Sequence, residues 1–302
     1  RRHTRYIGDW SSDVCSSDLV RQIYVDGEFK TEDQAKISVF DRGLLFSDSL
    51  YEVTTVINGK LIDFNNHMKR LDRSMKELNF KKLLNHKDIL VFHRKLIELN
   101  NLQEGMIYLQ VTRGVADRSF DMPKNEIEPT VFAFTQEKKI IDSEGAKNGI
   151  KIMTVDDMRW KRCDIKTTQL LYSSMVKTQA TSKGFDDAWM IRQGYITEGS
   201  SNNVWIIKGK IIMTRHADNL ILSGITRDAI FKCAKDLGYE VVTKNISQQD
   251  AQSAHEAFVT SATAFVMPVV KINSNQIGDG KPGKFTLALR AEYIKQAIEN
   301  SI

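Results

Sequence analysis

Two tight-turn signals, each next to a run of apolar and β-branched residues, place the strongest constraint on how this chain folds. Asp26-Gly27 follows the run at 23–25, and Asn58-Gly59 follows the run at 50–56. Such dipeptides readily adopt the positive φ angles that two-residue hairpin turns require. They therefore predict antiparallel strand pairs early in the chain.

Helical spacing of apolar residues follows the second hairpin. Asn65 or Asn66 is expected to cap this helix, and its apolar stripe comprises Met68, Leu71, Met75 and Leu78. A second amphipathic pattern covers residues 87–99, and the runs at 106–112 and 130–135 return to strand spacing. The first part of the chain is therefore predicted to be α+β.

The stretch at 136–148 resembles a linker most closely, because it is charged and ends in small polar residues. A chain of 302 residues is long for one domain and comfortable for two. We predict a small α+β domain at 20–137, an interdomain linker at 138–148 and a larger domain at 149–302. The larger part alternates strands with helices.

Residues 1–19 differ from the rest of the chain. They are polar, show neither helical nor strand periodicity, and end where a clear strand pattern begins. We interpret them as a non-native extension, and we expect them to be disordered and dispensable.

Composition narrows the function classes. The net charge is +5, but the basic residues are dispersed, so nucleic-acid binding is not favoured. No apolar run reaches the length that a membrane span needs. The three cysteines have neither metal-ligand spacing nor the pattern of a disulfide framework. We therefore expect no metal and a soluble, cytoplasmic protein.

Two short motifs in the second half carry candidate chemistry. Lys166 ends the run 162–166 among apolar neighbours, and a lysine in a partly apolar pocket is suited to covalent catalysis as an amine nucleophile. Glu198 precedes a turn of small hydroxyl and amide residues at 199–203. Alone, each motif is also compatible with a solvated surface residue.

Together with three further motifs, these stretches resemble the fold-type-IV, or class IV, aminotransferases that use pyridoxal 5'-phosphate (PLP). The five motifs occur in the family's order: Ser49–Val53, Asn66–Leu71, Arg162–Lys166, Glu198–Asn203 and Leu222–Arg227. The resemblance runs from about Ile23 to the C-terminus. It implies a two-domain α+β or α/β fold, with an N-terminal α+β domain and a C-terminal β-barrel-like domain with flanking helices.

The resemblance also implies roles around PLP. Lys166 would form the aldimine and move a proton, Glu198 would pair with the pyridine nitrogen, and Arg159 would lie near the phenolic oxygen. The remaining expected cofactor contacts include the phosphate ligands and the residue against the ring face: Arg70, Ser201, Asn203, Leu222, Ile225, Thr226 and Ala262. The family usually has a phosphate-binding threonine where this chain has Ala262, so a backbone N–H or a neighbouring hydroxyl would replace that contact.

Substrate contacts are expected from Tyr51, Val53, Arg118 and Thr263. The Tyr-Glu-Val sequence at 51–53 resembles the D-amino acid aminotransferase branch, whereas the branched-chain branch usually has Phe-Glu-Gly. Arg118 matches an arginine that reaches the neighbouring subunit's site and binds the substrate carboxylate, which implies a homodimer. The histidine expected two residues later is Phe120.

The favoured interpretation is ping-pong transamination between D-amino acids, such as D-alanine or D-glutamate, and 2-oxo acids such as pyruvate or 2-oxoglutarate. A branched-chain L-amino acid aminotransferase and an aminodeoxychorismate lyase share the fold and remain alternatives because of Phe120. A nucleic-acid-binding protein and a PLP-binding protein without turnover are the alternatives from other classes.

Overall fold

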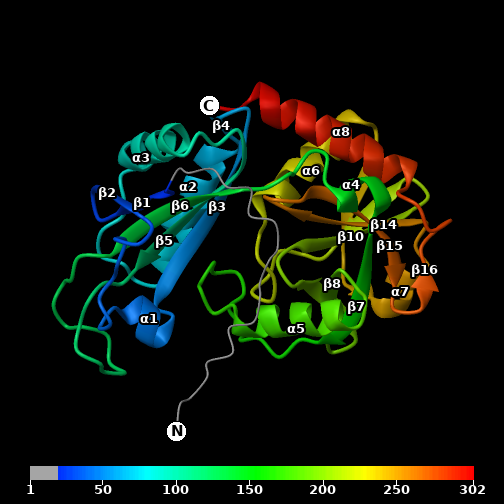
Figure 1. Cartoon of the computed structure of the whole chain (residues 1–302). Helices are drawn as coiled ribbons and strands as arrows, with labels where there is room; N and C mark the ends of the chain where they lie inside the picture. The colour runs from blue at the N-terminus through cyan, green and yellow to red at the C-terminus, as the bar shows by residue number, and fades with distance from the viewer. Residues whose placement is uncertain (1–19) are drawn as a thin grey trace, which may run out of the picture.

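The computed structural model describes residues 20–302, and the proposed extension at 1–19 lies outside the described residues. Each of two β-sheets forms the centre of its own body, and the bodies lie side by side (Figure 1). The first sheet uses residues between 22 and 137, and the second uses residues between 150 and 276. This two-body α+β arrangement is the fold that the sequence predicted.

The first sheet has six strands in the order β2-β1-β6-β5-β3-β4, and all of its pairs are antiparallel. The two predicted hairpins are present, because β1 pairs with β2 across Asp26-Gly27 and β3 pairs with β4 across Asn58-Gly59. The strands are β1 (Gln22–Val25), β2 (Glu28–Thr31), β3 (Ser49–Ile57), β4 (Lys60–Leu61), β5 (Glu104–Thr112) and β6 (Val131–Glu137).

One face of this sheet is covered by α2 (Phe64–Glu77) and α3 (His86–Leu99), while the short α1 (Arg42–Phe46) precedes β3. The apolar core joins Leu50 and Val56 of β3 to Met68 and Leu71 of α2. Because side chains alternate along a strand, Tyr51 and Val53 point to the opposite face, toward the second body.

The start of α2 corrects one sequence-based prediction. Its N-cap is Asp63, in a left-handed conformation and without a side-chain cap, rather than Asn65 or Asn66, which lie inside the helix. The Asp63 carboxylate instead accepts a hydrogen bond from the Tyr293 hydroxyl near the C-terminus, at 2.9 Å. This distant contact has no local sequence signal.

The second sheet is mixed and follows the order β12-β11-β10-β14-β15-β7-β8-β9-β13, with β16 beside β15. It curls so that apolar side chains of distant strands, such as Trp189, Val204 and Val259, share one core. The strands are β7 (Ile150–Asp156), β8 (Asp187–Arg192), β9 (Tyr195–Gly199), β10 (Asn203–Lys208), β11 (Ile211–Thr214), β12 (Glu240–Thr243), β13 (Ile246–Ser247), β14 (Glu256–Ser261), β15 (Phe265–Ile272) and β16 (Asn275–Gln276).

Helices flank this sheet, as Figure 1 shows. Ile230 of α6 (Ile225–Asp236) and Leu289 of α8 (Lys284–Glu299) pack against Trp205 and Phe258. On another part of the sheet, α5 (Leu171–Ser182) packs on β7 and β8. The remaining helices are the short α4 (Glu144–Asn148) and α7 (Gln248–Gln252). Within residues 20–302, no helix is both long and apolar enough to cross a bilayer.

The segment between the sheets is held more firmly than a flexible linker. Its last part folds as α4, and its first part is fixed by buried Arg290 of α8, which donates to the carbonyl oxygens of Ile140 and Ile141 at 2.6 and 2.9 Å. The Glu104 carboxylate accepts hydrogen bonds from the N–H groups of the same two residues.

A buried histidine predicts how the small body responds to acid. His93 lies between Phe64 and Phe92, its Nδ1 contacts the Ile89 carbonyl oxygen at 2.9 Å, and burial lowers its pKa to about 3. The unfolded chain takes up this proton near pH 6.5, so stability is present above that pH and is lost as pH falls toward 3, by about 1.4 kcal/mol per pH unit.

We expect His93→Phe to flatten the dependence of melting temperature on pH between 7 and 4.5, because the variant has no proton to take up at this position. Scanning calorimetry across this range measures the slope. The exposed His216 supplies the control, and His216→Gln should keep the wild-type slope. An unchanged slope in His93→Phe would show that other groups govern acid unfolding.

Candidate active site

A cavity lies between the two sheets, and most of the predicted site residues line it. Arg118 and Thr263 are the two exceptions. The lining residues that the sequence predicted are Tyr51, Val53, Arg70, Arg159, Lys166, Glu198, Ser201, Asn203, Leu222, Ile225, Thr226 and Ala262. The structure thus gathers residues from β3, α2, β9, β10, α6 and the turn after β14 around one space.

Main-chain hydrogen bonds to the small body position Lys166. The Tyr51 N–H donates to the Lys166 carbonyl oxygen at 3.0 Å, and Leu50 and Thr167 form an isolated β-bridge. The segment carrying the lysine therefore extends the pairing of β3, although it belongs to the second half of the chain. The Lys166 amine lies 4.1 Å from the centre of the Tyr51 ring, so an aromatic face partly shields it.

Glu198 is buried at the end of β9, and its carboxylate accepts hydrogen bonds from three donors. Arg159 Nη1 contacts its Oε1, while the Leu222 N–H and Asn203 Nδ2 contact its Oε2 at 3.0 and 3.3 Å. Burial raises the pKa of Glu198 above its ordinary value, and the nearby Arg159 and Leu222 N–H oppose this rise. The site therefore contains a carboxylate of fixed orientation in a dry environment.

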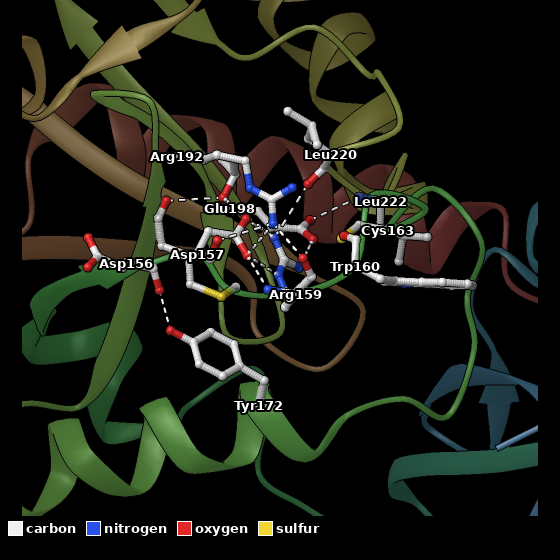
Figure 2. Close-up of polar contacts among 12 residues, drawn as sticks. Asp156, Asp157, Arg159, Trp160, Cys163, Tyr172, Arg192, Glu198, Leu220 and Leu222 are labelled. Carbon is white, nitrogen blue, oxygen red and sulfur yellow. Dashed lines mark hydrogen bonds and ion pairs between the residues drawn. The ribbon is translucent and has the colours of Figure 1, made fainter. Parts of the chain in front are cut away.

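Arg159 connects this carboxylate to a second one (Figure 2). Its guanidinium also donates to both oxygens of Asp157, at 3.0 and 2.9 Å. Although burial alone would raise the pKa of Asp157, hydrogen bonds and charge from Arg159 lower it. The sequence predicted Arg159 near a phenolic oxygen. Arg159 lines the cavity, so that role stays a prediction, and its contacts in the structure orient Glu198. The sequence analysis assigned no role to Asp157.

A buried aspartate shapes the turn that follows Glu198. Asp187 of β8 accepts hydrogen bonds from the Ser200 hydroxyl and from Asn202 Nδ2, each within 2.6 Å. A Cβ on Gly199 would lie 2.1 Å from Asn202 Oδ1, so a larger residue there would displace the Asn202 side chain. Ser201 remains exposed at the cavity. The sequence contained no signal for Asp187, because it lies on a different strand.

Arg70 of α2 is buried in an ion pair with Glu52 of β3. Its Nε and Nη2 contact the two Glu52 oxygens, both at 2.8 Å, and His67 Nδ1 contacts the same carboxylate at 2.7 Å. Burial alone would raise the pKa of Glu52, but Arg70 and His67 lower it to about 2. Arg70 Nη1 donates to the Ser223 carbonyl oxygen at 3.0 Å, which links the bodies beside α6.

The start of α6 faces the cavity with free backbone donors. Its N-cap is Gly224, which supplies no side-chain cap, and Ile225 and Thr226 of the first turn line the cavity. A Cβ on Gly224 would lie 2.2 Å from Asn203 Oδ1, so a larger residue there would displace the Asn203 side chain. The N-terminus of a helix attracts anions through its unpaired N–H groups and its dipole.

The turn after β14 closes the cavity beside β3. The Ala262 carbonyl oxygen accepts a hydrogen bond from Thr55 Oγ1 at 2.6 Å, which fixes the turn against the small body. Thr263 is not among the residues that line the cavity, and its hydroxyl lies 3.3 Å from Lys138 Nζ. Its expected contact with substrate stays a prediction.

Arg118 lies outside the cavity, on the loop between β5 and β6. Its guanidinium rests against the rings of Phe46 and Phe120, each 5.4 Å from the ring centre, and Phe120 is 84% exposed. The structure does not bring Arg118 to Lys166 in the same chain. Asp48 anchors the base of this loop, because it accepts hydrogen bonds from Arg42 and Arg113.

The cavity therefore combines an amine, a buried carboxylate and a helix N-terminus beside an arginine. The sequence profile of the amino-transferase class IV family matches residues 49–272, which include every one of these groups. The chain belongs to this family.

Its curated relatives include D-alanine aminotransferases. That of Staphylococcus aureus is 36% identical over 285 residues, which cover 94% of this chain and all of the relative. Those of Staphylococcus haemolyticus and Bacillus licheniformis are 37% and 34% identical, and the matches cover 91% and 93% of this chain and 97% of each relative.

Solved structures with the same fold include branched-chain amino acid aminotransferases. That of Escherichia coli has a TM-score of 0.85 and 24% identity, covering 92% of this chain and 95% of the other. That of Thermoproteus uzoniensis, solved with norvaline, has a TM-score of 0.82 and 23% identity, with the same coverage of both chains. At this identity the likeness establishes the fold alone.

The enzyme is a PLP-dependent aminotransferase, and the residues of the cavity fit this cofactor. Lys166 offers the amine, Glu198 offers an oriented carboxylate, and the first turn of α6 offers donors for a phosphate. When bound, PLP supplies the electron sink that lets a proton leave the α-carbon of an amino acid.

Proposed function

We propose that this enzyme transfers the amino group of D-amino acids to 2-oxo acids by ping-pong exchange. D-Alanine and D-glutamate are the proposed donors, and pyruvate and 2-oxoglutarate are the acceptors. The observation that carries the proposal is the 36% identity to the D-alanine aminotransferase of Staphylococcus aureus along the whole length of that protein. Tyr51 and Val53, the residues that resemble this branch, both line the cavity.

The contacts described above support a separate role for each group of residues in the site. Lys166, whose amine lies at the cavity wall, would move a proton between the α-carbon of the substrate and the cofactor carbon. Glu198 would keep a proton on the ring nitrogen of the cofactor, and Leu222 would pack against the ring. Ile225, Thr226 and the nearby Arg70 would bind the phosphate, with Ser201, Asn203 and Ala262 at the edges of this pocket.

Glu52 and His67 act through Arg70 rather than on substrate. Their contacts keep the guanidinium of Arg70 in one orientation. The Glu52 carboxylate accepts hydrogen bonds from two nitrogens of Arg70, and His67 contacts the same carboxylate. A bidentate pair of this kind fixes geometry as well as charge. Arg159 orients Glu198 in the same way.

A homodimer completes the proposed site, because Arg118 lies outside the cavity of its own chain and would serve the carboxylate of a substrate in the neighbouring one. Exposed apolar side chains lie on the same loop and on α1, which carries Phe46: Leu44, Val115 and Met122 are 61, 48 and 58% exposed. Apolar surface of this kind is typical of an interface. Sedimentation should give twice the chain mass of 34.5 kDa, and a monomer would contradict the role of Arg118.

The test of the function is the visible absorbance of the PLP-loaded enzyme during addition of a single amino acid. We expect D-alanine to remove the absorbance band of the bound cofactor and L-valine to leave the band unchanged. A response to L-valine alone would assign the enzyme to the branched-chain branch. Turnover of D-alanine with 2-oxoglutarate then separates transamination from a lyase reaction.

A further inference from the structure

The turn at 261–264, between β14 and β15, has unpaired main-chain donors. It is closed by the Ala264 N–H, which donates to the Ser261 carbonyl oxygen at 3.4 Å, and Ser261 and Ala262 line the cavity. Within residues 20–302, the N–H groups of Ala262 and Thr263 make no hydrogen bond. Consecutive N–H groups in a turn form a concave site for an anion. The turn therefore offers main-chain donors to an anion in the cavity.

The residue that follows this turn has a strained backbone. Phe265 has a φ of 57°, although its side chain is bulky and only 1% exposed. A positive φ is unfavourable for a residue with a large side chain, and it persists only where the surrounding structure enforces it. The ring of Phe265 packs edge-on against Tyr293 of α8, with the ring centres 5.0 Å apart. Helix α8 therefore helps to hold this conformation.

Arg290 of α8 holds the main chain on both sides of Phe265. Its Nη1 donates to the carbonyl oxygens of Ala264 and Val266, both at 2.8 Å. Its Nη2 donates to the two carbonyl oxygens at 140–141, in the segment between the sheets. All the side-chain hydrogen bonds of Arg290 within residues 20–302 thus go to the main chain. Charged donors form stronger hydrogen bonds than neutral ones, so this buried guanidinium fixes the base of the turn.

Thr55 of β3 holds the tip of the same turn from the small body. Its hydroxyl donates to the Ala262 carbonyl oxygen at 2.6 Å. The Ala262 carbonyl group and the Thr263 N–H belong to one planar peptide unit, in which they point in opposite directions. The hydrogen bond from Thr55 therefore also fixes the direction of the unpaired Thr263 N–H.

We propose that Thr55 and Arg290 are positioning residues for the phosphate of PLP. They fix the turn at 261–264 so that its main-chain N–H groups bind the phosphate, because the side chain of Ala262 has no hydroxyl for this purpose. The strained backbone of Phe265 belongs to the same arrangement. The inference rests on the proposed place of the phosphate beside Ala262. Neither positioning residue acts on the reacting atoms.

The test measures the dissociation constants of PLP and of pyridoxal, which lacks the phosphate, by titration of the cofactor-free full chain. Thr55→Val keeps the shape of the side chain and removes the hydroxyl, whereas Thr55→Ser keeps the hydroxyl. In Thr55→Val, we expect the Kd of PLP to rise about tenfold, equivalent to ~1.4 kcal/mol, and the Kd of pyridoxal to stay unchanged. Thr55→Ser should retain the wild-type ratio of the two constants.

The neighbouring residue on β3 supplies a matched control. Thr54 is also buried, but its hydroxyl has no hydrogen-bond partner in the part of the chain that the structure describes. Thr54→Val should therefore leave the ratio unchanged. Arg290→Lys keeps the positive charge but not the paired nitrogens, and it should also weaken PLP more than pyridoxal. Its melting temperature shows whether it folds, and Thr55→Val decides the test if it does not.

An equal loss of affinity for PLP and pyridoxal in Thr55→Val would overturn the inference, as would an unchanged Kd for PLP. The same loss in Thr54→Val would overturn it too, because any buried hydroxyl on β3 would then have this effect. These binding constants do not depend on which amino acid the enzyme converts. A phosphate-selective loss in Thr55→Val without turnover of any D-amino acid would support the inference and overturn the proposed function.

Discussion

Lys166→Ala is expected to lower kcat for transamination by about 10³-fold or more, because one amine both anchors the cofactor and carries the proton. The loss should not come from unfolding, since the Lys166 amine contacts mainly the Tyr51 ring, and the main-chain bonds of the segment remain. The measurements are single-turnover kinetics with D-alanine and the visible spectrum of the enzyme after gel filtration with PLP.

Two variants control this experiment. Lys166→Arg keeps the positive charge but cannot form the covalent bond, so it should be as inactive as the alanine variant. Lys161→Ala removes an exposed lysine from the same loop and should retain full activity. Substantial turnover in Lys166→Ala would mean that another amine reacts, and the assignment of the site would then be wrong.

The second large effect is expected at Glu198. Glu198→Gln keeps the shape and removes the charge, so it should lower kcat by about 10²-fold if the carboxylate stabilises charge on the cofactor ring. The stability of the fold should fall less than the activity, because Arg159 retains both hydrogen bonds to Asp157. The measurement is kcat/KM for D-alanine together with the melting temperature.

Glu198→Asp separates charge from geometry, because it keeps the charge on a shorter side chain. It should retain more activity than Glu198→Gln. Glu137→Gln, at an exposed position in the small body, serves as the surface control. If the glutamine variant were as active as wild type, the negative charge of Glu198 would not contribute to the reaction. Its role would then be to stabilise the structure of the turn.

The sequence predicted the elements and most of the cavity, because both depend on short-range patterns. The Asx-Gly pairs predicted the first hairpins. The motifs around Lys166 and Glu198 line the same cavity, as the resemblance implied. What it could not predict were partners that lie far apart in the chain. Asp157 and Asp187 show no pattern of their own, yet they orient Arg159 and the turn at 199–202.

One further difference lies at the start of α2. Asp63 precedes α2 in a left-handed conformation, and its carboxylate accepts a hydrogen bond from Tyr293, 230 residues away, so capping preferences alone pointed to the wrong residue. Arg118 lies outside the cavity of its own chain, where its guanidinium rests on Phe46 and Phe120. Its expected role in the site of a neighbouring subunit stays a prediction.

The hydrogen bond from the Tyr51 N–H to the Lys166 carbonyl oxygen has a consequence for protein engineering. Lys166 is paired through its main chain with a strand more than a hundred residues earlier in the chain, so the contact between the two bodies includes the residue that we propose as the reactive amine. A chimera that exchanges residues 20–137 for those of a relative would replace Tyr51 and Val53 in the cavity wall. It would also replace the strand to which the main chain of Lys166 is hydrogen-bonded. Changing specificity by recombination therefore requires a donor whose third strand reproduces this edge.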